Sequence, residues 1–237
     1  FDIEFSDENN KLQNPYQTSW GVSTRLIGMI IMAHGDDKGL KLPPNLAPIQ
    51  IVIVPIIPNE GNAKIINDKV KEVYELLKDY RVEIDDRTEV SPGYKFNEWE
   101  LKGVPLRIEV GQNEVKGNKV VISRRDIDKS KVDILFENIK EEVDKILVDI
   151  QSNLLKKSKD HLDQNTTHVD TFDGLIDTLN KKSGFVSCYW DENKKDELKV
   201  KEATSATIRC YPLSNNEKKQ SINQKGDGNF TIFSKAY

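Results

Sequence analysis

The chain has 237 residues, 37% apolar and 31% charged, a balance typical of a globular protein with one large domain or two smaller ones. Its 35 basic and 39 acidic side chains give a net charge of −4, which excludes a bulk basic field for nucleic acid. Any RNA contact must therefore be a local patch. Two cysteines, Cys188 and Cys210, allow at most one disulfide and indicate a reduced, cytosolic protein. No run approaches the ~18 apolar residues of a membrane span, and no signal-peptide pattern precedes the first strand.

Residues 18–25, TSWGVSTR, concentrate several kinds of chemistry in one short segment. Gly21 permits the close approach of a backbone, and Trp20 supplies an apolar wall. Ser23 and Thr24 can form hydrogen bonds, while Arg25 can pair with a phosphate or stack on a base. The segment therefore predicts a site for a small charged ligand. The alternative is a strand and turn whose arginine makes a surface ion pair.

The apolar run at residues 26–33 is compatible with a buried strand or with a short buried helix. Its length and its flanking glycines do not decide between the two. The run ends in His34-Gly-Asp-Asp, which we interpret as a turn with structural carboxylates. Because the chain opens on alternating apolar and acidic residues without a methionine, we expect a strand that belongs to a longer polypeptide.

Residues 47–155 have the pattern of an α/β domain with parallel pairing. A β-branched run at 47–57 predicts a buried strand, and apolar residues from Ile65 to Leu77 predict an amphipathic helix that ends near Tyr80. The remaining expectations are a strand at 81–85, a turn, short helix and strand within 91–111, a strand within 117–126, and a long amphipathic helix at 132–155.

Residues 156–237 indicate an α+β segment with lysine-rich polar loops. A helix is expected at 169–179, and strands are expected at 184–190, 206–213 and 229–237. The predicted fold class is therefore α/β together with α+β, in three parts at residues 1–46, 47–155 and 156–237.

Several long stretches resemble the class II prolyl-tRNA synthetases of the archaeal and eukaryotic type. TSWGVSTRLIG, followed by MAHGDDKGLKLPPNLAPIQIVIVPI, is similar to that family's motif 3 and the exit from its catalytic domain. SPGYKFNEWELKGVPLRIEVG and VVISRRD are similar to its anticodon-binding domain, and NFTIFSKAY to its C-terminal extension. The resemblance implies the end of an antiparallel-sheet catalytic domain, an α/β anticodon-binding domain with a mixed sheet, and a small α+β C-terminal domain.

The resemblance also implies a role for each polar residue of the first segment. In the family, motif 3 carries an arginine that clamps the phosphates of ATP or stacks on adenine, which makes Arg25 the implied catalytic residue. The implied chemistry converts L-proline and ATP, with Mg²⁺, to prolyl-adenylate and then transfers the prolyl group to tRNA(Pro). The implied contacts are Ser23, Thr24 and Arg25 with ATP, and Ser19, Trp20 and Gly21 with proline.

The family's motifs 1 and 2 are absent from these 237 residues, so the chain alone is not expected to be a complete catalyst. Motif 1 lies at the family's dimer interface, which implies a cytoplasmic homodimer formed through a missing N-terminal catalytic part.

Glu100 and Arg107 stand seven residues apart and offer an acceptor and a donor for the edges of guanine, the kind of groups that read unstacked RNA bases. The resemblance implies that both read the anticodon. The alternative is a surface salt bridge between the two side chains. A local basic edge for the phosphates is expected from Lys102, Arg124, Arg125 and Lys129.

Members of the family often carry a four-cysteine zinc site in the C-terminal domain. Cys188 matches the first position, but Asn193 stands at the second, and residues 218–230 contain no cysteine. Cys210 matches a position that is not a ligand. One thiolate does not supply a tetrahedral site, so no zinc is expected. The terminal Tyr237 is expected in a docked strand whose carboxylate lies near the active site.

Three functions fit these observations. The first is the C-terminal half of a prolyl-tRNA synthetase. The second is a tRNA- or RNA-binding module derived from a class II synthetase that has lost catalysis, against which the intact Trp20, Gly21 and Arg25 argue. The third is a related synthetase of the threonyl or histidyl type, which the stretch KFNEWELKGVPLR and the closing tyrosine disfavour.

Overall fold

A computed structural model describes residues 2–58, 60–128, 130–215 and 217–235, and the chain forms two compact units, Phe1–Gln151 and Ser152–Tyr237. Among these described residues, no helix has both the length and the apolar character needed to cross a lipid bilayer. The unit boundary falls within one long helix, so the predicted divisions at residues 46/47 and 155/156 stay predictions.

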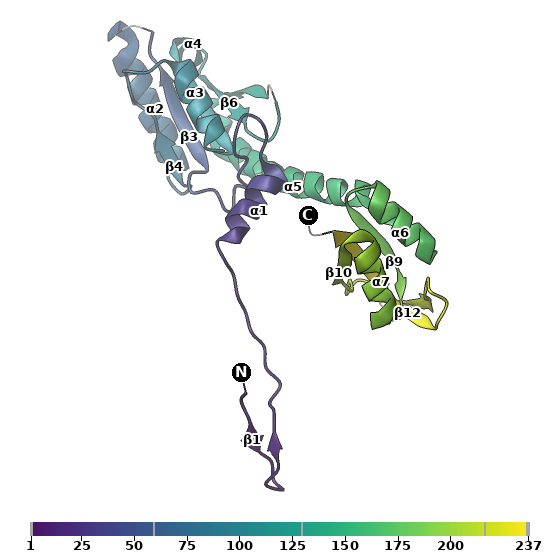
Figure 1. Ribbon diagram of the computed structural model, residues 1–237. Helices are drawn as coiled ribbons and strands as arrows, with labels where there is room; N and C mark the ends of the chain where they lie inside the picture. Colours follow the sequence, from purple (N-terminus) through teal and green to yellow (C-terminus); the bar gives the residue numbers. More distant parts are fainter. Residues whose placement is uncertain (1, 59, 129, 216, 236–237) are drawn as a thin grey trace. The chain divides into compact units, whose positions relative to one another are not determined.

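The first unit is built around one five-stranded sheet (Figure 1). Its elements in chain order are β1 (Phe5–Ser6), β2 (Leu12–Gln13), α1 (Arg25–His34), β3 (Ile51–Ile56), the short 3₁₀ helix η1 (Glu60–Asn62), α2 (Ala63–Leu77), β4 (Val82–Ile84), α3 (Pro92–Leu101), β5 (Leu106–Gly111), α4 (Gln112–Lys116), β6 (Lys119–Arg124), β7 (Lys131–Leu135), η2 (Phe136–Asn138) and α5 (Ile139–Gln164).

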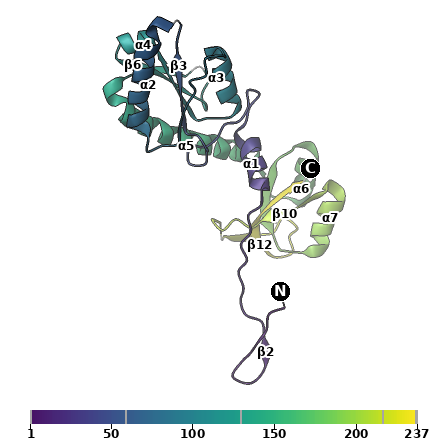
Figure 2. The ribbon, with the colours of Figure 1, turned by 90° about the vertical axis from the view of Figure 1, so that its left-hand side faces the viewer.

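The strand order is β4-β3-β5-β6-β7, with β3 parallel to both β4 and β5 and with antiparallel pairing from β5 to β7. The sheet is therefore mixed, as expected for this part of the chain. Parallel strands need crossover connections, and α2 and α3 supply them. In Figure 2, these two helices lie on opposite sides of β3.

Burial on both faces explains why β3 is a continuous β-branched run. Ile51, Val52, Ile53 and Val54 are fully buried, because neighbouring side chains of a strand point to opposite faces and each face is covered. Val52 and Val54 pack against Trp99 of α3. The stripe of α2 at Ile66, Val70, Val73 and Leu77 is buried as its helical spacing predicts.

A buried carboxylate after β4 holds the first turns of α3. Asp85 accepts hydrogen bonds from Arg87 Nε (2.8 Å) and Nη2 (2.7 Å) and from Trp99 Nε1 (2.8 Å). Lys95 Nζ donates to the Asp85 backbone carbonyl at 2.8 Å and lies 3.7 Å from its carboxylate. The Arg87 guanidinium and these other donors hold the pKa of Asp85 well below its usual range. The side chain is only 1% exposed, so α3 depends on this cluster for its position.

The expected long helix at 132–155 is wrong at its start. Residues Lys131–Leu135 form β7, which pairs antiparallel with β6 and buries Ile134 opposite Val120. Val132 and Ile134 alternate with polar residues as in a strand, whereas Leu135 continues the helical stripe of α5. Pairing with β6 decides between the two patterns. The helix α5 then begins at Ile139 and continues to Gln164.

The open question at residues 26–33 is resolved in favour of a helix, α1, which begins at Arg25. The opening strand, expected over residues 1–5, is not formed at residues 2–4. Only the two residues of β1, Phe5–Ser6, pair with β2 in an antiparallel hairpin. Phe1 lies outside the described residues.

The second unit also has one sheet, of order β10-β12-β9-β8 with β11 paired to β12. The strands next to β12 are antiparallel to it, and β8 is parallel to β9. Helices α6 and α7 contribute Leu175, Leu179 and Val200 to its apolar core around Trp190 and Phe233. Its elements are β8 (Thr166–His168), α6 (Phe172–Lys181), β9 (Phe185–Trp190), α7 (Lys194–Thr204), β10 (Ala206–Cys210), β11 (Lys218–Gln220) and β12 (Asp227–Lys235).

The sequence prediction found α6, β9, β10 and β12 but missed α7, β8 and β11. The helix α7 buries only Asp196, Val200 and Thr204, a stripe with one strongly apolar residue, so its pattern resembles a polar loop. The last two residues, including Tyr237, lie outside the described residues.

The Asp85 cluster yields a test of what holds α3. We expect Asp85→Asn to lower the free energy of unfolding by about 3 kcal/mol, because Arg87 and Lys95 lose the anion that they share in a buried setting. Urea denaturation followed by tryptophan fluorescence measures the change. Asp86→Asn is the matched control, since it removes the same charge at an exposed neighbouring position and should cost at most about 0.5 kcal/mol. Equal effects of the two substitutions would contradict the assignment.

Candidate functional site

The residues predicted to bind ATP and proline lie together on one exposed segment. Residues 19–23 have no regular structure, and Arg25 is the first residue of α1. Every side chain of the set is exposed, and Trp20 is 91% exposed. The predicted set therefore lies on a single exposed segment of the described residues. The roles assigned to Ser19, Trp20, Gly21, Ser23, Thr24 and Arg25 stay predictions.

Helix α1 is apolar on much of the surface that it exposes within this chain. Leu26, Ile27, Met29, Ile31 and Met32 are all exposed large hydrophobic side chains. A helix that is apolar over so much of its circumference is typical of one that other chain segments bury. The expectation that this run is buried is therefore not met among the residues that the structure describes.

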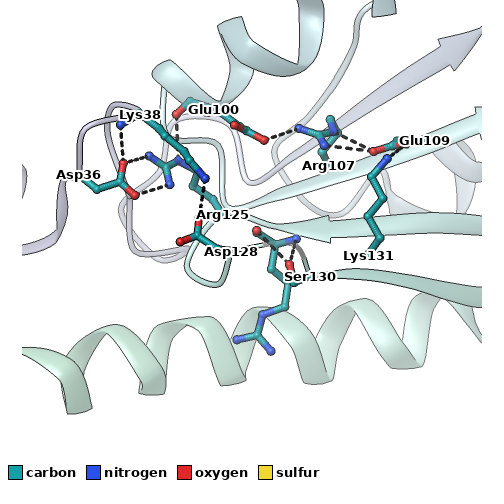
Figure 3. Close-up of polar contacts among 10 residues, drawn as sticks. Asp36, Lys38, Glu100, Arg107, Glu109, Arg125, Asp128, Ser130 and Lys131 are labelled. Atoms are coloured by element: carbon teal, nitrogen blue, oxygen red, sulfur yellow. Dashed lines mark hydrogen bonds and ion pairs between the residues drawn. The ribbon is translucent and has the colours of Figure 1, made fainter. Parts of the chain in front are cut away.

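Glu100 and Arg107 are brought together by the end of α3 and the start of β5, as Figure 3 shows. Arg107 Nη1 lies 3.2 Å from Glu100 Oε1. The two side chains therefore form an ion pair, and it is not a surface pair, because the Arg107 side chain is only 9% exposed. Glu100 is 35% exposed and forms the outer member. Their role in reading bases stays a prediction.

Two further residues, which sequence reasoning missed, fix the Arg107 guanidinium. Glu109 Oε1 accepts from Arg107 Nε at 3.2 Å and from Nη2 at 3.1 Å, and the guanidinium carbon lies 4.1 Å from the centre of the Phe96 ring. Arg107 and Glu109 are alternate residues of one strand, so their side chains share a face of the sheet. This spacing in the sequence could have indicated their contact. A hydrogen-bonded guanidinium stacked on an aromatic ring is held in one plane, so Arg107 is preorganised.

Lysine side chains surround this pair at its exposed side. Lys131 Nζ lies 2.8 Å from Glu109 Oε2 and its side chain is 55% exposed. Lys102 Nζ lies 2.7 Å from Glu98 and 4.4 Å from the centre of the Trp99 ring, with its side chain 49% exposed. Both ammonium groups are paired with carboxylates and partly exposed, and the contact of Lys102 with a phosphate stays a prediction. Lys129 lies outside the described residues.

The two consecutive arginines after β6 do not form the expected basic edge. Arg124 pairs with Asp126 at 2.8 Å and with Asp149 at 2.5 Å, and its side chain is 13% exposed. Arg125 pairs with Asp36 and is 5% exposed. Both guanidinium groups serve contacts within the chain, because acidic side chains far away in the sequence meet them in the fold. A small hollow remains here, lined by Trp99, Glu100, Arg107, Ser123, Arg124 and Arg125.

The residues present in the second unit do not fit a zinc ion. Cys188 is fully buried, and burial raises the pKa of its thiol to about 12, so it stays protonated. Asn193 caps α7 by accepting hydrogen bonds from the backbone N–H groups of Lys195 and Asp196. Among the described residues, no group of three or more His, Cys, Asp or Glu side chains is placed to hold a metal ion.

A polar network occupies this end of the second unit. The buried carboxylate of Asp196 pairs with Lys199 at 2.9 Å and with Lys225 at 2.5 Å, and Asn223 Nδ2 donates to it at 3.1 Å. Asn223 also donates to Asp191 at 2.8 Å. The ion pairs with Lys225 and Lys199 lower the pKa of Asp196 to about 2. The network joins the end of β9, the start of α7 and the loop before β12.

Comparison with known proteins agrees with this geometry. Residues 50–146 match the family described as "Anticodon binding domain", and residues 172–237 match the family described as "Prolyl-tRNA synthetase, C-terminal". A proline–tRNA ligase of Alkaliphilus oremlandii is 49% identical over 214 residues, which cover 90% of this chain and 44% of the relative. A proline–tRNA ligase of Flavobacterium johnsoniae is 41% identical over 247 residues, which cover 100% of this chain and 49% of the relative. The chain spans about half the length of the curated relatives it matches.

The Asp196 network predicts a specific dependence of stability on pH. Because the pKa of Asp196 is lowered in the folded state, its contribution is complete above its ordinary pKa of 3.8 and is lost as the pH falls toward 2. We expect Asp196→Asn to destabilise the chain by about 1–3 kcal/mol at pH 6, and the difference from the wild type should shrink toward pH 2.

Thermal unfolding followed by circular dichroism between pH 2 and pH 6 measures this difference. Asp177→Asn is the matched control, since it breaks an exposed pair with Lys181 and should cost at most about 0.5 kcal/mol. An Asp196→Asn effect that is constant over the whole pH range would refute the network's role.

Proposed function

We propose that this chain, which belongs to the prolyl-tRNA synthetase family, forms the anticodon-reading and C-terminal half of an enzyme that charges tRNA(Pro) with L-proline. The two family matches and the names of the relatives support the assignment. The observation that carries it is the combination of an anticodon-binding domain with a segment that ends in an exposed Arg25 and an exposed apolar helix.

The reaction has two steps in this proposal. The carboxylate of L-proline attacks the α-phosphate of ATP, which releases pyrophosphate and forms prolyl-adenylate. A ribose hydroxyl at the end of tRNA(Pro) then takes the prolyl group and releases AMP. Catalysis rests on positioning and on charge neutralisation, with no covalent bond to the protein.

Arg25 neutralises charge on the phosphates of ATP or stacks on adenine, and Ser23 and Thr24 hydrogen-bond the nucleotide. Trp20 and Gly21, with Ser19, form the wall against the proline ring. Mg²⁺ enters with ATP. The apolar side chains of α1 pack against the remainder of a catalytic domain, which also supplies the second ATP-binding arginine and the homodimer interface. Zinc takes no part, and the enzyme works in the cytoplasm.

In the anticodon-binding part, Glu100 and Arg107 read guanine. The Glu100 carboxylate accepts from the amino and imino groups of one base edge, and the Arg107 guanidinium donates to the acceptors of the other. Lys102 and Lys129 contact phosphates. Proline anticodons contain two consecutive guanines. A carboxylate and a guanidinium held 3.2 Å apart, those of Glu100 and Arg107, suit such bases.

Proline-dependent exchange between ATP and pyrophosphate tests the catalytic assignment. We expect the parent protein to show exchange and this chain alone to show none, because the chain carries only one wall of the site. Arg25→Ala in the parent should lower exchange at least about a hundredfold, since a charge contact to the reacting phosphates is lost. Arg25→Lys keeps the charge, so its exchange rate should lie between those of the unchanged parent and of Arg25→Ala.

Binding of tRNA separates this loss from misfolding, because it should be unchanged in both Arg25 variants. Near-normal exchange by Arg25→Ala would refute the motif 3 assignment. A parent protein that binds tRNA and shows no exchange would be a binding module that has lost catalysis.

Arg107 yields the complementary prediction. We expect Arg107→Lys to raise the KM for tRNA in the charging reaction about tenfold, because lysine keeps the charge and loses the planar fork. Exchange between ATP and pyrophosphate, measured on the same variant without tRNA, should be unchanged. If exchange and charging fall together, Arg107 has a structural role.

A further inference from the structure

The segment that follows α1 is fastened to the end of α3. We name residues 36–42 the strap. Leu40 N donates to the Leu101 carbonyl at 3.0 Å, and Leu42 N donates to the Gly103 carbonyl at 3.2 Å. The strap begins with a tight turn in which Asp36 and Gly39 exchange two backbone hydrogen bonds of 3.0 Å, so the interpretation of this stretch as a turn is confirmed. The strap therefore runs along the last turn of α3.

Two glycines allow this close approach. Gly39 has φ +129°, and a Cβ there would lie 2.5 Å from Leu101 Cα. Gly103 has φ +73°, and a Cβ there would lie 2.5 Å from Leu40 Cβ. Side chains at either position would be strained and would push the strap away from the helix. The contact is thus made backbone to backbone, which leaves little freedom for α3 to move relative to the strap.

The guanidinium of Arg125 joins the strap to the backbone carbonyl of Glu100, a predicted base reader. Arg125 Nη2 lies 2.5 Å from Asp36 Oδ1, and Arg125 Nη1 donates to Asp36 Oδ2 at 3.0 Å. Arg125 Nε donates to the backbone carbonyl of Glu100 at 3.0 Å, as Figure 3 shows. Lys41 also pairs with Asp36 at 2.7 Å. The guanidinium of Arg125 holds the pKa of Asp36 well below its usual range, so the pair is fully ionised near neutral pH.

The Glu100 carbonyl belongs to the last turn of α3, where helix carbonyls lack partners within the helix. Gly103 N and Arg125 Nε both donate to it at 3.0 Å. A cation at a helix C-terminus also interacts favourably with the helix dipole. Without Arg125, the last turn of α3 can fray. A frayed turn would move the Glu100 carboxylate away from Arg107 Nη1.

We propose that Asp36 and Arg125 are positioning residues for the reading of guanine by Glu100. Asp36 orients the Arg125 fork, Arg125 holds the Glu100 backbone, and the Glu100 carboxylate is thereby kept beside Arg107. Neither Asp36 nor Arg125 needs to touch RNA, and both are largely covered by protein, with side chains 27% and 5% exposed. This inference rests on the proposed function, because it needs Glu100 to accept hydrogen bonds from the base.

The test uses two RNA hairpins that differ by the group that Glu100 is proposed to recognise. One carries an anticodon loop with two consecutive guanines, and the other has inosine at both positions, which lacks the exocyclic amino group. Dissociation constants for the full 237-residue chain are measured by fluorescence anisotropy at one salt concentration. We expect the wild type to prefer the guanine hairpin about tenfold. Arg125→Lys and Asp36→Asn should both lose that preference and bind the two hairpins alike.

Matched variants separate positioning from a loss of folding. Asp37→Asn removes the same charge at the exposed neighbouring residue and should keep the wild-type preference. Asp36→Glu retains the carboxylate and should restore part of the preference that Asp36→Asn loses. Melting temperatures of all variants are measured alongside. A general loss of structure would weaken binding to both hairpins equally, so it would leave the ratio of the two dissociation constants unchanged.

Two results would overturn the inference, and they have different meanings. If the wild type prefers guanine and both variants keep the same ratio, Asp36 and Arg125 do not position the reader, and the reading role proposed for Glu100 stands. If the wild type shows no preference, the reading role of Glu100 in the proposed function fails as well.

Discussion

The position of α3 is the constraint on which the predicted RNA-reading surface depends. Along one side of this helix, the buried carboxylate of Asp85 gathers Arg87 together with Lys95 near the helix start and Trp99 in its last turn. At its end, the strap and Arg125 hold the last turn. Both attachments are charge-assisted and largely buried, which makes them strong and also intolerant of the loss of one partner. A helix fixed in this way can present Glu100 to Arg107 in one geometry.

The distribution of charge is consistent with a mildly acidic chain that matches an anticodon-binding family without a bulk basic field. The predicted reader Arg107 and its neighbours Arg124 and Arg125 are all paired with carboxylates and mostly covered. The exposed cations around them are lysines, such as Lys102 and Lys131. Guanidinium groups thus organise the protein, since their planar fork satisfies several acceptors at once, whereas the flexible ammonium groups face solvent.

Polar contacts between side chains connect segments of the second unit that are distant in sequence. Asn193 caps α7, and the Asp196 carboxylate joins Lys199, Lys225 and Asn223 from segments that are distant in sequence. A network of this kind depends on the ionisation of one carboxylate, so its contribution varies with pH.

Patterns in the sequence determined much of this protein. The β-branched run of β3, the apolar stripe of α2 and the family resemblance were all confirmed, because burial on a repeating element leaves a periodic trace in the chain. Local patterns failed where one segment suited two periods, as residues 132–135 did, or where a buried stripe was narrow, as in α7. The Glu100–Arg107 contact could be suspected from spacing, yet only the tertiary structure decided that Arg125 turns inward. Its partner Asp36 lies 89 residues away, and no local pattern can report a contact that folding creates between two distant charges.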